Sequence, residues 1–241
     1  MPPGNPTVET EVIALAAAVN AAGGARRVSV HFTRMVAHGE AGAHQGFEER
    51  MRSQIAHIAD TTALLAMVKP QAIVMAHAGM SAILGKEGEA ELVERMQRVH
   101  GISFITAFGS VLAALAHLRA KRVALGTPYD ADSTLRTKAH LEAHGVQVVS
   151  HGRLPEVTNI YDETPERSRE LARSVDVPAA QAVFLSGLGM PTLAALESME
   201  RDLGKPVVSG VAACMWQALR LAGVAVPIKG YGRLLNADSE S

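Results

Sequence analysis

The sequence predicts an α/β fold with two pseudo-symmetric halves, each a short parallel sheet flanked by helices, and a cleft between the halves. Two observations carry this prediction: short apolar runs alternate with amphipathic segments, and one strand-and-turn sequence occurs twice. The chain has 241 residues, of which 48% are hydrophobic and 20% charged, so it is too apolar for a disordered protein and long enough to bury a large core.

The apolar runs have the length and the β-branched composition of buried parallel strands. Between them, apolar residues recur at helical spacing. Strand followed by helix, repeated along a chain, is typical of right-handed βαβ units. The predicted strands are Val28–Phe32, Ala72–Ala76, Ile102–Thr106, Arg122–Gly126, Val146–Ser150, Ala182–Ser186 and Lys205–Ser209; the predicted helices are Phe47–Val68, Glu89–His100, Ser110–Ala120, Thr134–His144, Thr164–Ser174, Thr192–Leu203 and Ala212–Ala222.

The internal repeat is seen where QAIVMAHAGM, which starts at Gln71, aligns without gaps with QAVFLSGLGM, which starts 110 positions later at Gln181. Farther along, GISFITAFGSVLAAL and GKPVVSGVAACMWQA match less closely. The repeat predicts one half made of residues 1–106 plus 212–241 and another made of residues 107–211. Because ligands of open parallel sheets bind beyond the carboxyl ends of the strands, we expect the two repeated turns, His77–Ser81 and Gly187–Pro191, to face one cleft.

Composition excludes several classes of function. The formal net charge is −1, without a basic run, so we expect no nucleic-acid partner and no membrane-surface partner. No apolar stretch is long enough to span a bilayer, and the start MPPGNPTVET lacks the pattern of a signal peptide, which predicts a cytoplasmic protein. A single cysteine, Cys214, excludes an intrachain disulfide and any CxxC motif. A small-molecule substrate or a protein partner remains.

The repeated strand ends differ in chemistry: His77 occupies the first and Gly187 the second. Histidine has a reference pKa near 6.5, so a histidine at a strand end over a cleft can give or take a proton at neutral pH. The structural alternative is a histidine that only hydrogen-bonds a neighbouring loop. Gly79, Gly187 and Gly189 would leave backbone N–H groups free to point at an anion, although tight-turn geometry alone explains glycine equally well.

Two further turns hold polar side chains. Tyr129 follows a strand in GTPYDADSTLR, where its hydroxyl can donate to an anion or simply pack over the next helix. Asn5 lies in a turn that opens a helix near Thr7, where it can bind an anion or cap the first helical turn. His140 and His144 have the i, i+4 spacing of metal ligands, but no third ligand is near them in the sequence, so we expect a solvent-exposed helix face and no metal. No nucleotide-binding glycine motif and no GxSxG motif occurs.

Several of these segments resemble one family. PPGNPTVE, LGTPY, PVVSGVAACMWQALRLAG and GYGRLL are similar to motifs of the aspartate/glutamate racemase superfamily, in the branch that contains maleate cis-trans isomerase and arylmalonate decarboxylase. The resemblance covers nearly the whole chain. It implies two Rossmann-like halves with the active site between them, no organic cofactor, no metal and a homo-oligomer.

The resemblance also implies which residues form the site. Members carry a catalytic cysteine at one or both repeated strand ends; here these positions are His77 and Gly187, or Gly79 in an alternative register of the first turn, and neither holds a thiol. Cys214 lies in the closing helix, where we expect it to pack in the core. The remaining substrate-binding positions implied by the resemblance are Asn5, Tyr129 and Asn159 for a carboxylate and the amides of Ala78, Gly79, Leu188 and Gly189 for an oxyanion.

Together these observations predict a cofactor-independent lyase or isomerase that acts on a small mono- or dicarboxylate. His77, in place of the first cysteine, and Tyr129 are its expected catalytic residues. Histidine suits hydration or decarboxylation at least as well as cis-trans isomerisation, and better than racemisation. The alternative is a non-catalytic protein of the same fold that binds a small carboxylate and has lost the chemistry together with both thiols.

Overall fold

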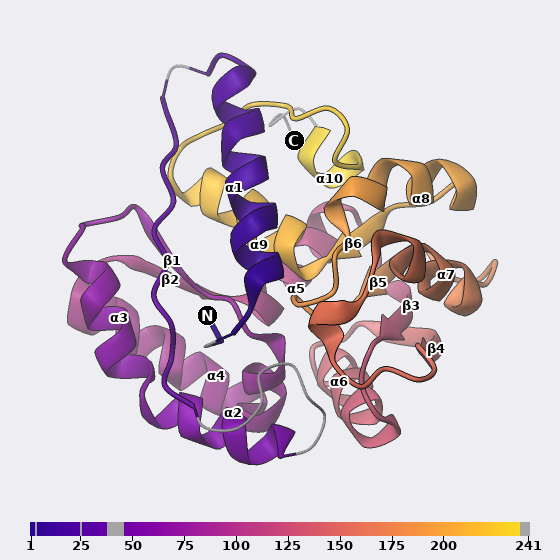
Figure 1. Ribbon diagram of the computed structural model, residues 1–241, viewed down its shortest axis with the longest axis horizontal. Coiled ribbons are helices and arrows are strands. Elements are labelled where there is room, and N and C mark those ends of the chain that lie inside the picture. The colour runs from indigo at the N-terminus through magenta and orange to yellow at the C-terminus, as the bar shows by residue number, and fades with distance from the viewer. Residues whose placement is uncertain (3, 25, 38–45, 237–241) are drawn as a thin grey trace.

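Two parallel sheets surrounded by helices organise the computed structural model, which describes residues 1–2, 4–24, 26–37 and 46–236 (Figure 1). One sheet pairs two strands, and the other has the order β4-β3-β5-β6, with every pairing parallel. The predicted α/β class with short parallel sheets is confirmed. The strands are β1 (Ala72–Met75), β2 (Ser103–Thr106), β3 (Arg122–Thr127), β4 (Gln147–Arg153), β5 (Ala182–Leu185) and β6 (Val207–Ser209).

The helices follow the predicted alternation with three adjustments. The helix predicted over residues 192–203 is a 3₁₀ turn over Leu193–Ala195 followed by an α-helix from Leu196. The predicted helix over residues 47–68 divides at His57, and the one predicted from Glu89 begins earlier, at Ala78, with a break in helical geometry at Gly85 (φ 70°, ψ 176°). The α-helices are α1 (Pro6–Ala21), α2 (Phe47–Ala56), α3 (Ile58–Ala66), α4 (Ala78–His100), α5 (Ala107–His117), α6 (Ala131–Ala143), α7 (Pro165–Val175), α8 (Leu196–Leu203), α9 (Gly210–Leu221) and α10 (Arg233–Asn236), and the 3₁₀ turns are η1 (Ile160–Asp162) and η2 (Leu193–Ala195).

The internal repeat has the same strand register in both sheets. Met75 pairs with Thr106, and their counterparts in the repeat, Leu185 and Ser209, pair with each other. Thr106 and Ser209 then cap the following helices, α5 and α9, because each hydroxyl accepts the N–H three residues further on. Helices α5 and α9 pack against each other. The sequence repeat therefore reflects one βα unit built twice; the residue boundaries predicted for the two halves stay a prediction.

The predicted strand Val28–Phe32 is wrong. These residues have no regular secondary structure, and β1 pairs only with β2 among the described strands. The Asn20 side chain holds the segment instead, since the Val28 N–H donates to Asn20 Oδ1 at 2.7 Å and Asn20 Nδ2 donates to the Val28 carbonyl at 2.8 Å. Val28, Val30 and Phe32 still pack against the main core. The alternation in the sequence thus reflects burial of one side without strand pairing.

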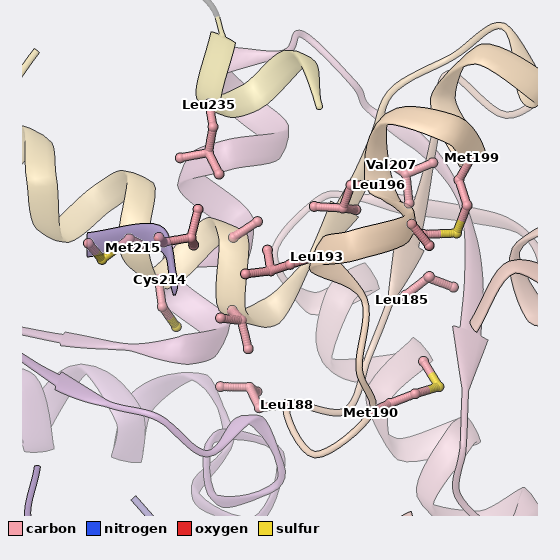
Figure 2. Close-up of a cluster of buried hydrophobic side chains, with 14 of the residues drawn as sticks. Leu185, Leu188, Met190, Leu193, Leu196, Met199, Val207, Cys214, Met215 and Leu235 are labelled. Atoms are coloured by element: carbon pink, nitrogen blue, oxygen red, sulfur yellow. The ribbon is translucent and has the colours of Figure 1, made fainter. Parts of the chain in front are cut away.

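The largest apolar cluster joins α1, α9 and the four-stranded sheet. Figure 2 shows Leu188 and Met190, from the second repeated turn, in the same cluster as Cys214 and Met215 of α9. This cluster fixes the turn after β5 against α9. None of the helices in the described part of the chain is both long and apolar enough to cross a membrane.

Candidate active site

The first repeated strand end places His77 directly before α4. The residue is extended (φ −153°, ψ 94°), its side chain does not accept an N–H group of the first helical turn, and it is only 8% exposed. Ala78 and Gly79 are the first residues of α4, and the first N–H groups of a helix have no intrahelical acceptor. These amides, predicted to lie in a turn, thus belong to the first turn of α4 and follow His77 directly, and their binding of an oxyanion stays a prediction.

Burial, with the positive charges of the Met1 ammonium and Arg50, lowers the pKa of His77 to about 3. A buried cation is costly because it loses hydration, and neighbouring cations add repulsion. His77 is therefore a neutral imidazole at pH 7, not an imidazolium.

A buried arginine near His77 was not predicted from the sequence. It is Arg50 of α2, with 9% exposure. Arg50 lies close enough to affect the pKa of both His77 and Tyr161. The sequence offers little signal for it: Arg50 and Gln54 are one helical turn apart and flank Met51, but the burial of all three is seen only in the structure. Buried cations of this kind suit an anionic ligand.

The second repeated strand end is built from glycines under steric constraint. Gly187 has φ +107°, and a Cβ there would lie 2.8 Å from Pro128 Cγ and 3.5 Å from the Tyr129 hydroxyl. A Cβ on Gly189 would lie 2.4 Å from Ile160 Cδ1 and 2.5 Å from Tyr161 Cε1. Both glycines are therefore needed for close packing, which supports the tight-turn interpretation; whether their amides also bind an anion stays a prediction.

Tyr129 follows β3, and its hydroxyl lies close to Gly187 in the turn after β5. Burial, followed by the neighbouring Tyr161, raises the pKa of Tyr129, so its phenol stays protonated and able to donate a hydrogen bond. Asp130, the next residue, caps α6 by accepting the Ser133 N–H at 2.7 Å. Tyr129 itself is not the cap, and its hydroxyl remains close to Gly187.

Asn159 and Asn5 both have structural roles. Asn159 Oδ1 accepts the Tyr161 N–H at 3.0 Å and caps η1. Asn5 is 2% exposed, and its Oδ1 accepts the Val8 N–H at 3.0 Å to cap α1. Their predicted roles in holding a carboxylate stay predictions.

The turn that opens α1 is attached to the second strand end. Thr7 Oγ1 donates to the Gly189 carbonyl at 2.8 Å, and Glu11 Oε1 accepts the N–H groups of Thr192 and Leu193 at 2.7 and 2.8 Å. The structure therefore brings together the turns and loops that contain Asn5, Tyr129, Asn159 and Gly187–Gly189. His77 lies near this group, because the charge of Arg50 affects the pKa of both His77 and Tyr161.

The only cysteine does not lie at either strand end. Cys214 is buried in α9, and burial raises the pKa of its thiol to about 12. It lines, together with Leu188 and residues of the 26–33 segment, a cavity of about 580 Å³. Leu188 is the one predicted site residue on the wall of this cavity; His77 is not on it. The thiol is thus an unreactive core group.

The prediction that His140 and His144 lie on an exposed face without a third ligand is wrong. His140 is 6% exposed, and its Nε2 lies 3.2 Å from Oε2 of Glu89, which comes from α4. The carboxylate could not be found from local spacing because it is 51 positions away in the sequence.

Comparison with known proteins identifies the family. The family model described as arylmalonate decarboxylase matches residues 33–235. The chain belongs to the arylmalonate decarboxylase family. It is 32% identical to a maleate isomerase of Nocardia farcinica, over 99% of this chain and 94% of that protein. It is 34% identical to the arylmalonate decarboxylase of Bordetella bronchiseptica, over 65% of this chain and 68% of that one.

Solved structures agree. The chain superimposes on a Nocardia farcinica maleate cis-trans isomerase variant that carries a covalently bound succinylcysteine intermediate, with a TM-score of 0.87, 27% identity and coverage of 99% and 96% of the two chains. Maleate isomerase of Pseudomonas putida S16 with maleate gives a TM-score of 0.89 at 24% identity, which supports the fold. The predicted family, fold and enzyme class, an isomerase or lyase, are confirmed. The predicted homo-oligomer, cytoplasmic location and absence of a cofactor stay predictions.

Proposed function

We propose that this family member is a lyase or isomerase that converts a small mono- or dicarboxylate without a catalytic thiol. The observation that carries the proposal is the buried Arg50 beside His77 and close to Tyr161, which gives the site positive charge. A carboxylate beside a buried guanidinium gains Coulomb attraction and charge-assisted hydrogen bonds in a low-dielectric environment, and these offset the cost of removing the carboxylate from water. Maleate and a succinyl group, named for two of the similar structures, are four-carbon dicarboxylates of this class.

His77 is proposed as the proton-transfer residue. Its imidazole is neutral at pH 7, because burial and the nearby positive charges lower its pKa to about 3. A bound carboxylate brings negative charge that offsets the cations and raises the pKa of His77. Proton uptake by the imidazole is thereby coupled to the arrival of substrate.

Two reactions fit these groups. In hydration, neutral His77 takes a proton from water as the hydroxide adds to the β-carbon, the electron pair of the double bond moves into an enediolate, and the imidazolium then returns the proton to the α-carbon. In decarboxylation, the C–C bond pair remains on the α-carbon as an enediolate when carbon dioxide leaves, and His77 protonated in the presence of substrate returns a proton to that carbon. The Tyr129 phenol and the turn amides would stabilise the oxyanion in both cases; removing one such donor typically costs about 3–4 kcal/mol of transition-state stabilisation.

A second candidate is a non-catalytic carboxylate-binding protein. It is favoured by the absence of cysteine from both repeated strand ends, together with the buried, high-pKa thiol of Cys214. A succinylcysteine intermediate of the kind named for the Nocardia protein needs a reactive thiolate. Cis-trans isomerisation through a covalent adduct is therefore the least suitable reaction for this chain.

The test is the replacement His77→Asn, assayed by NMR with maleate, fumarate and arylmalonates. Asparagine is a good helix cap, so α4 should keep its start. We expect turnover to fall by about 10²–10⁴-fold, the usual contribution of general acid–base catalysis. The matched control is His151→Asn, on the exposed part of β4, which should leave turnover unchanged.

The outcomes separate the candidates. Unchanged turnover in His77→Asn would remove the proposed role of His77. Wild-type protein that is stabilised by a diacid in thermal melts, but converts none of the compounds, would establish the binding protein instead.

A further inference from the structure

We propose that Glu89, His140 and His144 form a zinc-binding site that joins α4 to α6. His140 lies in the last turn of α6, His144 is the C-cap residue of that helix, and Glu89 comes from α4, which packs against α6. One carboxylate oxygen and one ring nitrogen from each histidine lie within 4.8 Å of one another. Two histidines and one carboxylate are a recurrent zinc ligand set.

The distances fit with a small adjustment. Zinc binds histidine nitrogen and carboxylate oxygen at about 2.0–2.2 Å, so tetrahedral neighbours lie about 3.3 Å apart. Glu89 Oε2 and His140 Nε2 already have this spacing, at 3.2 Å. The ring of His144, which is half-buried, would rotate toward them to complete the set.

Hydrogen bonds determine which atoms of two of these side chains are available as ligands. His144 Nδ1 lies 2.9 Å from the His140 carbonyl, and a carbonyl only accepts, so Nδ1 carries the proton and Nε2 is the ring nitrogen with a lone pair. Thr106 Oγ1 donates to Glu89 Oε1, which leaves Oε2 directed at His140. A ligand histidine whose second nitrogen donates to a carbonyl is typical of zinc sites.

Burial and access are also suitable. Glu89 and His140 are each 6% exposed, and the ring of Phe108 packs on His140 at a centroid distance of 4.2 Å. The carboxylate therefore has little water around it, and a divalent cation would offset its charge more fully than a hydrogen bond from a histidine. His144 is half-buried, so its side provides an entry route and a position for a fourth ligand, water.

The site would position two functional loops. Helix α4 begins immediately after His77, and α6 begins immediately after Asp130, the neighbour of Tyr129. An ion held by α4 and α6 fixes these two helix starts relative to each other. Its role is structural, and the proposal is independent of which carboxylate the enzyme converts.

The test uses the full chain, stripped with EDTA and dialysed. Zn²⁺ is titrated in competition with a chromophoric chelator, and Co²⁺ is titrated while the d–d absorption of a four-coordinate ion is followed. We expect one ion per chain and a melting temperature that rises with zinc concentration. Glu89→Gln keeps the shape of the side chain, and His144→Ala removes the most accessible ligand; each should weaken zinc binding by at least about tenfold.

The matched control is His117→Ala. His117 is also half-buried and also lies at the end of a helix, but it packs on Trp216, at a centroid distance of 5.0 Å, rather than on Glu89. This variant should bind zinc like wild type. Circular dichroism without metal checks that each variant folds; if Glu89→Gln does not fold, His144→Ala decides. Wild type without saturable binding, or His144→Ala with wild-type affinity, would overturn the proposal.

Discussion

The ends of β1 and β5 occupy equivalent positions in the internal repeat but differ in local chemistry. After β1, the chain passes through His77 straight into α4, and a neutral imidazole is buried beside cations. After β5, the chain makes an irregular turn through Gly187 and Gly189, which have no side chains and are packed against Pro128, Ile160 and Tyr161.

The difference shows how a repeated unit can form an asymmetric site. Strand register and helix caps are the same in both units, because Met75 pairs with Thr106 as Leu185 pairs with Ser209. The framework is therefore equivalent, while the residues just beyond the strands diverge. One end supplies a titratable group, and the other supplies a close-packed turn whose backbone faces the Tyr129 loop.

The largest expected effect comes from making the second end bulkier with Gly187→Ala. The added Cβ would lie 2.8 Å from Pro128 Cγ at a residue with φ +107°. Left-handed strain and overpacking together should lower the free energy of unfolding by about 2–4 kcal/mol. Turnover should fall as well, because displacement of Pro128 would also move Tyr129, the next residue in the chain. Urea unfolding measures the stability change.

Gly88→Ala is the control for this change. Gly88 lies inside α4, and a Cβ there would meet Leu84 Cβ at 3.6 Å, an ordinary contact. Alanine is the better helix former, so this variant should gain up to about 1 kcal/mol. A Gly187→Ala protein as stable as wild type would show that the second end is not sterically constrained.

An intermediate effect is expected on the pH dependence of the free energy of unfolding, through His77 at the end of β1. The pKa of His77 is about 3 in the folded protein and about 6.5 in the unfolded chain, so the unfolded state binds more protons between these values. The free energy of unfolding of the wild type is therefore unaffected by His77 above pH 6.5, and it falls as the pH drops from 6.5 toward 3, because only the unfolded chain binds the proton. At pH 5 the loss amounts to about 2 kcal/mol.

His77→Asn lacks this titration. Unfolding free energies of the two proteins at pH 7 and pH 5 should therefore show wild type losing about 2 kcal/mol relative to the variant. A difference that is constant with pH would mean that His77 titrates normally and that the first end is not a desolvated site.

Much of this framework could be predicted from the sequence. Apolar runs located all the strands of both sheets, and the repeat located both strand ends, because burial and local periodicity act along the chain. The failure at residues 28–32 has the same origin: Val28, Val30 and Phe32 alternate because one side packs on the core, and alternation does not report whether a neighbouring strand exists.

Groups that meet only in three dimensions could not be predicted. Glu89 reaches His140 across two helices, and Arg50 reaches His77 from a helix that precedes β1. Each partner belongs to a segment that reads as an ordinary amphipathic helix. The i, i+4 spacing of His140 and His144 could be recognised in the sequence, but the proximity of the Glu89 carboxylate, the third candidate ligand, could not.

The smallest effect is expected from replacing Cys214, whose side chain has no role in the chemistry proposed for the ends of β1 and β5. Burial raises its pKa to about 12, so the fraction of reactive thiolate at pH 7 is negligible. Iodoacetamide should not modify it in the folded protein, and Cys214→Ala should keep turnover within about twofold while lowering stability by about 1 kcal/mol. Because Cys214 and Leu188 belong to one apolar cluster and line one cavity, a large loss of turnover would show that the core behind the second strand end controls its geometry. An unchanged rate would show that the Cys214 side chain takes no part in the chemistry.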